Sequence, residues 1–138
     1  MPGTLTLDAL KAAVASGEID TVLVAAPDMQ GRLMGKRFHA EFFLNGGYEE
    51  THCCNYLLAV DMEMNTVAGY KTSSWEKGYG EYVLRPDMGT LRLVPWLPGT
   101  ALVLGDLLDH HTHEEVDISP RAILKRQVAR AAPWGSSP

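Results

Sequence analysis

The sequence has 138 residues, of which 46% are hydrophobic, which is enough for one globular domain with a single core. Its formal net charge is −5 at pH 7 and it contains no basic run, which argues against a nucleic-acid or anionic-membrane surface. No apolar stretch approaches the roughly 18 residues of a membrane span, and no signal-peptide pattern opens the chain. We therefore expect a cytoplasmic protein that binds neither nucleic acid nor membrane.

The N-terminal part of the chain predicts a helix followed by a β-hairpin. Apolar residues recur at helical spacing over Thr4 to Ser16, with Thr6 or Thr4 as the cap and a glycine as the stop. Ile19 to Ala26 is an almost continuous apolar run, which indicates a strand buried on both faces. Arg32 to His39 carries three cationic side chains, so we expect this second strand nearer an edge of the sheet.

The central part predicts a helical turn, a further strand and a long loop. Ala40 to Leu44 precedes Asn-Gly-Gly, a pattern typical of a short helix stopped by glycine, with Phe42, Phe43 and Leu44 as core anchors. Tyr56 to Val60 has the length and composition of a strand. Trp75 to Gly89 is rich in glycine, tyrosine and charge, which predicts a loop suited to contacts rather than to the core.

Two apolar runs follow, with turn residues between them. Thr90 to Val94 alternates with the period of a strand, and Ala101 to Leu104 is a continuous apolar run suited to a central strand. Prolines and Gly99 lie between the two runs, where they end pairing and allow a turn. We expect a hairpin-like pair of strands here.

The last predicted element is a helix over Arg121 to Ala132. Ser119 suits its N-cap and Pro120 its first position. Its apolar stripe is formed by Ile123, Leu124 and Val128. Little chain follows to cover this stripe, so we expect the helix to be poorly anchored. Taken together, the predicted elements indicate an α+β domain.

Several groups of polar residues are candidates for chemistry. A histidine cluster has acidic neighbours, but its spacing fits no closed zinc site, and a solvated linker is the favoured interpretation; its members are His110, His111 and His113, with Asp109, Glu114 and Glu115. Six carboxylates show no spacing that forces a pair into one site; they are Asp28, Asp61, Glu63, Glu81, Asp87 and Asp106. Asp28 and Asp87 adjoin prolines in turns, which favours structural caps.

Three further patterns favour ordinary structural roles. Gly31, Gly35 and Lys36 do not have the spacing of a phosphate-binding P-loop. The cations among residues 32–37 are expected on a solvated or interface face of the edge strand. The adjacent Cys53 and Cys54 are expected as ordinary buried or half-buried thiols, because a disulfide between neighbouring residues is strained.

The best candidate for function is the loop Gly69 to Gly80, which combines three aromatic side chains with lysines and serines. Such a mixture suits a wall that faces a ligand or another subunit. The alternative is a surface loop whose aromatic residues pack on their own domain, and the sequence leaves both interpretations open.

An ordered set of motifs resembles the glutamine synthetase family, and more narrowly the branch that joins glutamate to amines. The motifs are G-Y-G-E ending at Glu81, R-P-D-x-x-T-L-R over Arg85 to Arg92, P-W-x-P-G-T-A over Pro95 to Ala101, a following aspartate, and S-P-R over Ser119 to Arg121. An earlier D-x-x-G-R-x-x-G-K-R stretch, at residues 28–37, fits the family's first hairpin. The resemblance runs from about Ile19 to Ala132 and concerns the N-terminal portion of the family only.

The resemblance implies a β-grasp-like mixed sheet with an N-terminal helix, followed by the first helix of a catalytic domain that is missing here. It implies boundaries at 1–17 for the helix, 18–113 for the β-grasp domain, and 114–138 for the linker and the start of that catalytic domain. In the family, ATP and Mg²⁺ or Mn²⁺ activate glutamate, an amine or ammonia completes the reaction, and a homo-oligomeric ring holds sites between subunits.

For this chain the resemblance implies no catalytic residue, no metal ligand and no cofactor of its own. We therefore expect no activity from it alone; the alternative is a stand-alone β-grasp module for binding or assembly. The family's D-G-S-S loop, which helps to bind ammonium, corresponds to Lys71, Thr72, Ser73 and Ser74, followed by Trp75. These five residues are the candidate amine or ammonia site. Lys71 repels ammonium, which favours a larger amine beside Trp75.

Overall fold

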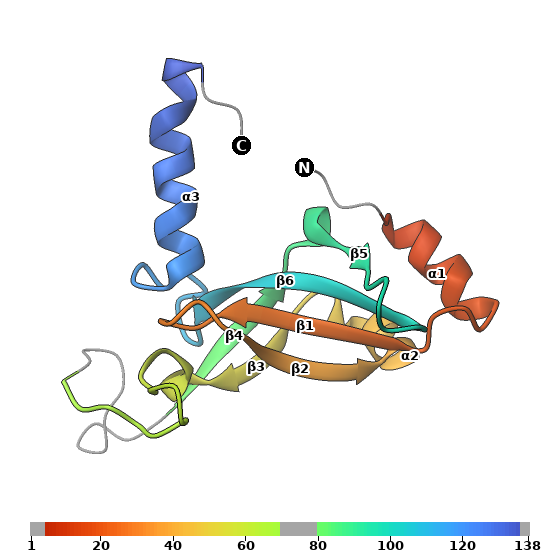
Figure 1. Ribbon diagram of the computed structural model, residues 1–138, viewed down its shortest axis with the longest axis horizontal. Coiled ribbons are helices and arrows are strands. Elements are labelled where there is room, and N and C mark those ends of the chain that lie inside the picture. The colour runs from red at the N-terminus through yellow and green to blue at the C-terminus, as the bar shows by residue number, and fades with distance from the viewer. Residues whose placement is uncertain (1–4, 70–79, 136–138) are drawn as a thin grey trace.

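The computed structural model describes residues 5–69 and 80–135, which form a mixed six-stranded sheet with three helices beside it (Figure 1). The helices are α1 (Leu7–Ala15), α2 (Ala40–Phe42) and α3 (Pro120–Ala131). The strands are β1 (Thr21–Pro27), β2 (Leu33–His39), β3 (Thr51–Cys54), β4 (Glu81–Pro86), β5 (Arg92–Leu93) and β6 (Thr100–Asp109). None of the helices among these residues is long and apolar enough to cross a membrane.

The strand order is β2-β1-β6-β4-β3, with the short β5 also paired to β6. The two central strands β1 and β6 run parallel, with Thr21 beside Thr100, while every other pair is antiparallel. The predicted hairpin is β1 and β2, and β2 is an edge strand as expected. The predicted α+β class with a mixed sheet and an N-terminal helix is thereby confirmed.

The core lies against β1, β6 and β4 and includes Leu10 of α1 and Phe43 after α2. The Thr6 side chain caps α1 by accepting the amide of Ala9 at 3.1 Å, as its position predicted. Phe42 is not a core anchor, because its side chain is 61% exposed and stacks on Phe38 with ring centroids 5.5 Å apart. Of the two adjacent phenylalanines, Phe43 therefore faces the core and Phe42 faces the surface.

The predicted loop Trp75 to Gly89 is wrong for the residues that form a central strand of the sheet. Glu81–Pro86 of this stretch is strand β4, which lies between β3 and β6. Three successive apolar side chains of β4 are buried: Tyr82, Val83 and Leu84. Its polar flanks suggested a loop, but pairing on both sides satisfies its backbone and its apolar centre fits the core.

The predicted strand at Tyr56 to Val60 is also wrong. Asn55–Leu58 is a 3₁₀ turn, and the amide of Ala59 donates to the Tyr56 carbonyl at 2.7 Å. The chain then reverses at Asp61, whose carboxylate accepts the amides of Glu63 and Asn65. Because the chain reverses here, the extended segment is too short to pair as a strand. Within residues 56–60, only Val60 pairs, in an isolated bridge with Thr66.

The predicted hairpin-like pair near residues 90–104 exists as β5 and β6, but the two strands differ greatly in length. β5 has two residues, since prolines follow it closely, whereas β6 has ten and is the central strand. Leu102 of β6 pairs with Arg92 on one side and Leu23 on the other. Because β6 is paired with strands on both sides, it is longer than the apolar run Ala101 to Leu104 from which it was predicted.

Helix α3 begins where the sequence predicted, with the Ser119 side chain accepting the amide of Ala122 at 3.3 Å. Ala122 is buried, whereas Ile123 and Leu124 are 43% and 62% exposed. Figure 1 shows α3 rising from the sheet, with only its N-terminal end beside the strands. The apolar stripe is exposed as expected, but the first turns are held to the sheet by ion pairs.

We expect hydrogen exchange in α3 to be graded along the helix. Amides of its last turn should exchange among the fastest in the chain, because little packs on that end. The hydrogen-bonded amides of Ile123, Leu124 and Lys125, close to the ion pairs, should exchange more slowly, and added salt should narrow the difference in exchange rate by screening those ion pairs. Exchange resolved by residue, on a verified monomer, measures both effects. Uniformly slow exchange along the whole helix would contradict this prediction.

Candidate functional site

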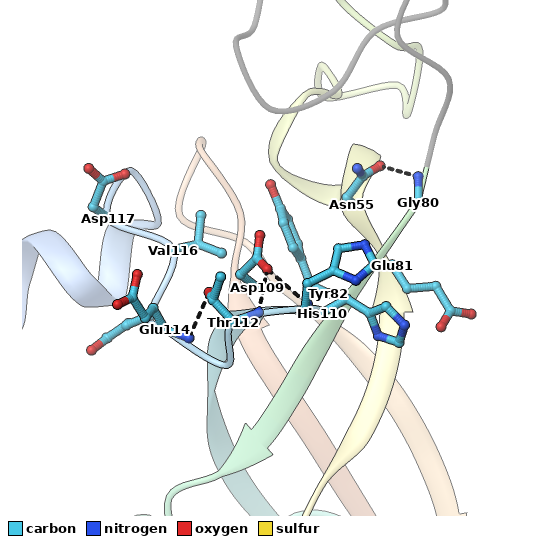
Figure 2. A pocket seen from close by; sticks show the side chains of 12 residues that line it. Asn55, Gly80, Glu81, Tyr82, Asp109, His110, Thr112, Glu114, Val116 and Asp117 are labelled. Carbon is cyan, nitrogen blue, oxygen red and sulfur yellow. Dashed lines mark hydrogen bonds between the residues drawn. The ribbon is translucent and has the colours of Figure 1, made fainter.

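A cavity of about 660 Å³ opens at the end of the sheet where β4 begins and β6 ends (Figure 2). It is lined by Asn55, by residues 80–82, and by most of the segment 109–117. The lining combines imidazoles, carboxylates and the ring of Tyr82. It is therefore a polar recess formed by three parts of the chain that lie far apart in sequence.

The predicted amine loop ends at this recess. Gly80 donates its amide to Asn55 Oδ1 at 3.1 Å, and the Asn55 amide donates to the Gly80 carbonyl at 3.0 Å. These two hydrogen bonds hold the C-terminal end of the loop Gly69 to Gly80 against the cavity wall. The five candidate residues Lys71, Thr72, Ser73, Ser74 and Trp75 lie outside the described residues.

The segment after β6 is an ordered turn. Asp109 Oδ1 accepts the amides of His111 and Thr112 at 2.8 and 2.9 Å, and these hydrogen bonds hold the pKa of Asp109 below its usual range. His113 has a left-handed φ of 58° and donates its amide to the Asp109 carbonyl. The exposed side chains of residues 110–115 agree with the solvated segment that the sequence predicted. The hydrogen bonds to Asp109 hold the backbone of this segment in a defined turn.

The structure brings His110 together with two residues that the sequence analysis did not associate with it. His52 Nδ1 lies 3.0 Å from Glu81 Oε2, and the rings of His52 and His110 have centroids 5.7 Å apart. The hydrogen bond with His52 is the main cause that lowers the pKa of Glu81. His52 was missed because its strand was not predicted; the pairing of β3 with β4 is the signal that identifies it.

Asp28 and Arg32 form a clamp between two turns. The Asp28 carboxylate is fully buried and accepts the amides of Gln30 and Arg32 and the side chain of Arg32, at 2.8–3.0 Å. Burial raises the pKa of Asp28, but these hydrogen bonds outweigh it and hold the pKa below its usual value. Arg32 also donates to the carbonyls of Asp61 and Met62. The expected capping role of Asp28 is confirmed; the expected solvated strand position of Arg32 is wrong.

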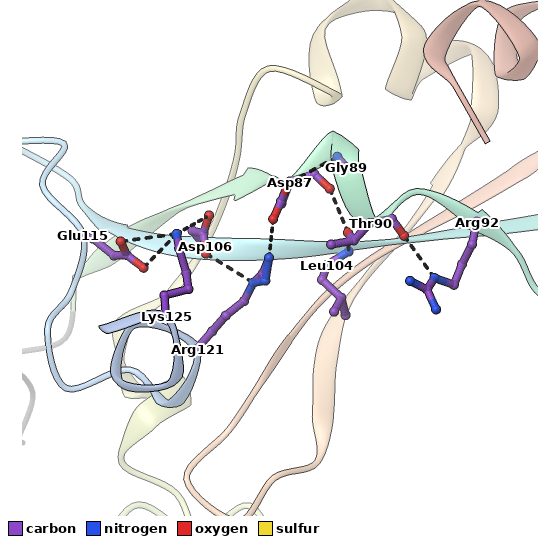
Figure 3. A network of polar contacts seen from close by, with 9 residues as sticks. All are labelled: Asp87, Gly89, Thr90, Arg92, Leu104, Asp106, Glu115, Arg121 and Lys125. Carbon is purple, nitrogen blue, oxygen red and sulfur yellow. Dashed lines mark hydrogen bonds and ion pairs between the residues drawn. The ribbon is translucent and has the colours of Figure 1, made fainter. Parts of the chain in front are cut away.

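A second ionic network joins α3 to the sheet (Figure 3). Arg121 pairs with Asp87, and its Nε lies 3.3 Å from Asp106 Oδ1. Lys125 Nζ lies 3.2 Å from Asp106 and 3.3 Å from Glu115. Burial lowers the pKa of Lys125, but the hydrogen bonds and charges of Asp106 and Glu115 outweigh it and raise the pKa. The network fixes the direction in which α3 leaves the domain.

Two smaller expectations have clear outcomes. Asp87 caps its own turn by accepting the amide of Gly89 at 3.2 Å, as predicted, in addition to pairing with Arg121.

Both cysteines are free thiols. Cys53 is half-buried, and burial raises its pKa to about 11, whereas Cys54 is exposed rather than half-buried. The low acidity of the Cys53 thiol argues against a nucleophilic role for it.

Known proteins share the fold of this chain and much of its sequence. No family model matches the chain. A solved structure of GmaS with ADP superimposes with a TM-score of 0.64 at 20% identity, covering 90% of this chain and 25% of that one, which shows a shared fold. The chain therefore has the fold of a part of that protein.

Relatives found by sequence identify the family to which the chain belongs. Gamma-glutamylethanolamide synthetase GlnA4 of Streptomyces coelicolor is 53% identical over 132 residues, covering 95% of this chain and 28% of the relative. Glutamate–isopropylamine ligase of a Pseudomonas species is 37% identical, covering 85% and 26%. Type-1 glutamine synthetase 2 of Dictyostelium discoideum is 27% identical, covering 79% and 21%. The chain belongs to the glutamine synthetase family, matches its N-terminal portion, and spans about a quarter of the length of these relatives.

Proposed function

We propose that this chain serves as the N-terminal portion of an ATP-dependent ligase that joins glutamate to an amine, in the cytoplasm. The observation that carries the proposal is the 53% identity to gamma-glutamylethanolamide synthetase across 95% of the chain. The second relative is also a glutamate–amine ligase by name, so two relatives named for an amine product or substrate are more similar to the chain than the type-1 glutamine synthetase is. In this proposal the amine is larger than ammonia.

The described residues do not fit the catalytic metal of such a reaction. Mg²⁺ prefers oxygen ligands in a near-octahedral arrangement, usually carboxylates and phosphates. Among residues 5–69 and 80–135, the group of three potential ligands comprises two imidazoles and one carboxylate, His52, His110 and Glu81. The ATP and Mg²⁺ or Mn²⁺ of the ligase are therefore proposed to bind residues other than these.

The contribution proposed for this chain is a wall of the amine site and a contact between subunits. The Asn55–Gly80 hydrogen bonds hold one end of the loop Gly69 to Gly80 beside the polar recess. A loop held at its end presents aromatic and cationic side chains at lower entropic cost than a free one. We propose that the loop faces the site of a neighbouring subunit in a homo-oligomeric ring.

A two-part experiment tests this function. The purified chain, given ATP, Mg²⁺, glutamate and ethanolamine, is expected to release no phosphate. A chimera in which it replaces the corresponding N-terminal portion of gamma-glutamylethanolamide synthetase GlnA4 is expected to keep activity that depends on glutamate and ethanolamine. A chimera that assembles like its parent but is inactive would favour the alternative, a stand-alone β-grasp module. Phosphate release by the chain alone would contradict the division of roles.

Within the active chimera, Lys71→Asp is expected to raise the use of ammonia relative to ethanolamine by roughly tenfold. A cation repels ammonium by about 1 kcal/mol at ~4 Å in water and by more where water is excluded, and each 1.4 kcal/mol is about tenfold. The measurement is the ratio of kcat/KM for the two amines. Lys77→Asp makes the same charge change elsewhere in the loop and should leave the ratio unchanged. An unmoved ratio in Lys71→Asp would reject the role of Lys71 in selecting the amine.

A further inference from the structure

Three side chains from three neighbouring strands converge beside the recess. His52 lies on β3, Glu81 is the first residue of β4, and His110 follows the last residue of β6. His52 Nδ1 lies 3.0 Å from Glu81 Oε2. One potential ligand atom from each of the three residues lies within 4.8 Å of the other two. This convergence is independent of the amine loop and of the proposed ligase function.

The strand pairing explains why these residues meet. Cys54 lies opposite Glu81 and Tyr82 lies opposite Asp109 in the antiparallel ladders. One further step places His110 across from Glu81, and His52 is two residues from Cys54 on the same face of β3. Directly opposite residues lie about 5 Å apart at their Cβ atoms, and diagonal residues such as His52 and Glu81 about 7–8 Å, which is within reach of long side chains. The cluster is thus built on strand ends, whose backbone the sheet holds in place.

The donor set suits a particular group of metal ions. Imidazole nitrogens with one carboxylate oxygen are typical ligands of Zn²⁺ and related late first-row divalent ions, whereas Mg²⁺ and Ca²⁺ prefer oxygen alone. Three protein ligands leave a coordination position open to water or to a small ligand. Glu81 and His110 also line the 660 Å³ recess, so an open position here lies at its edge.

The surroundings of His52 favour one ring nitrogen as the ligand. Its Nδ1 faces Glu81, while its Nε2 lies 3.9 Å from the Glu50 carboxylate. In the metal-free chain the hydrogen bond to Glu81 holds the ring proton on Nδ1. A metal between Nδ1 and Glu81 displaces that proton, and the Glu50 carboxylate favours the remaining ring proton on Nε2. We propose that His52, Glu81 and His110 form a binding site for a zinc-type divalent ion that links β3, β4 and the end of β6.

The test uses the full chain, freed of metal with a chelator and then titrated with Zn²⁺ by calorimetry and with Co²⁺ by visible absorption. We expect one ion per chain and a rise in Tm with excess Zn²⁺. His52→Ala and His110→Ala should each weaken binding at least about tenfold, since the loss of mere outer-shell partners already costs 10–100-fold. Glu81→Gln should weaken binding as well. Because all three side chains are exposed or half-exposed, these variants are expected to fold, which circular dichroism checks.

Two control variants separate this site from adventitious binding. His39→Ala removes an exposed histidine on β2 whose side chain forms no cap hydrogen bond, and it should bind Zn²⁺ like the unaltered chain. Cys54→Ser removes the exposed thiol opposite Glu81 and should also bind normally. Unchanged affinity in His52→Ala and His110→Ala, equal loss in His39→Ala, loss in Cys54→Ser, or the absence of saturable binding would each overturn the proposal.

Discussion

Asp28→Ala is expected to destabilise the folded chain by about 3 kcal/mol, because it removes the buried carboxylate of a charge pair and leaves a partly buried guanidinium without it. The Asp28 side chain is fully buried and accepts three hydrogen bonds, two from backbone amides and one from Arg32. Without it the two amides lose their acceptor, and the guanidinium of Arg32, which is 27% exposed, keeps only its carbonyl partners. Arg32 is then no longer fixed by Asp28, so its hydrogen bonds to the turn at residues 61–64 anchor that turn to the hairpin less firmly.

Urea unfolding at pH 7 measures this loss. Asp117→Ala is the control, since Asp117 is an exposed aspartate, and it should change the free energy of unfolding by no more than about 0.5 kcal/mol. Asp28→Asn should fall between the two, because an amide oxygen still accepts backbone amides while its NH₂ group opposes Arg32. A loss below about 1 kcal/mol in Asp28→Ala would show that the clamp does not stabilise the fold.

The same residue makes stability depend on pH in a defined direction. The pKa of Asp28 is held below its ordinary value of 3.8, because hydrogen bonds from Arg32 and Gln30 overcome the effect of burial. A carboxyl group whose pKa is lower in the folded state stabilises the fold above its unfolded pKa, and this contribution is lost as pH falls through the folded pKa. The difference in unfolding free energy between the unaltered chain and Asp28→Asn should therefore shrink below about pH 4.

Gly35→Ala is expected to cost about 3 kcal/mol, at the upper end of what overpacking usually costs. Gly35 lies on β2 opposite Ala25 of β1. A Cβ at this position would lie 1.9 Å from the Val24 carbonyl oxygen and 2.7 Å from the Ala25 Cα. Both are backbone atoms of the neighbouring strand, so the hairpin has to separate to admit a methyl group.

Two other glycines calibrate the Gly35 result. Gly89→Ala should change stability by no more than about 0.5 kcal/mol, because its Cβ would come no closer than 3.4 Å to the Asp87 carboxylate. Gly105→Ala should be intermediate, since its closest contact, at 2.5 Å, is a side-chain atom of the buried Leu84 rather than a backbone atom. The loss of unfolding free energy should therefore be smallest in Gly89→Ala, larger in Gly105→Ala and largest in Gly35→Ala. A Gly35→Ala variant as stable as Gly89→Ala would contradict the clash.

Much of the local structure was predictable because its causes lie within a few residues. Thr6 and Ser119 cap their helices as expected, since a cap needs only a side-chain oxygen and an amide three residues on. The hairpin of β1 and β2 followed from an apolar run, a turn and a polar run. The resemblance to the glutamine synthetase family was equally legible, because ordered motifs remain visible without knowledge of the fold.

Other features depended on partners distant in sequence, and only the tertiary structure decided them. β4 has polar flanks that suggested a loop, yet pairing with β3 and β6 buries its centre. Arg32 was expected on a solvated face and instead forms the clamp, because the turn at Asp61 returns to it across 29 residues. The helix α3 was expected to be loosely held, yet Asp106 and Asp87 come from the sheet to pair with its first turn.

The cluster of His52, Glu81 and His110 shows the same division most clearly. Sequence alone associated His110 with His111 and His113. In the structure these neighbours lie in a solvated turn in which the amides of His111 and Thr112 donate to Asp109. Strand register instead brings it to residues 29 and 58 positions earlier, at a spacing that no local pattern encodes. Sequence by itself determined the family, the class of fold and the helix caps of this protein, because short-range contacts and ordered motifs carry them. The sheet decided which charged side chains meet, because antiparallel pairing joins residues according to register rather than to distance along the chain.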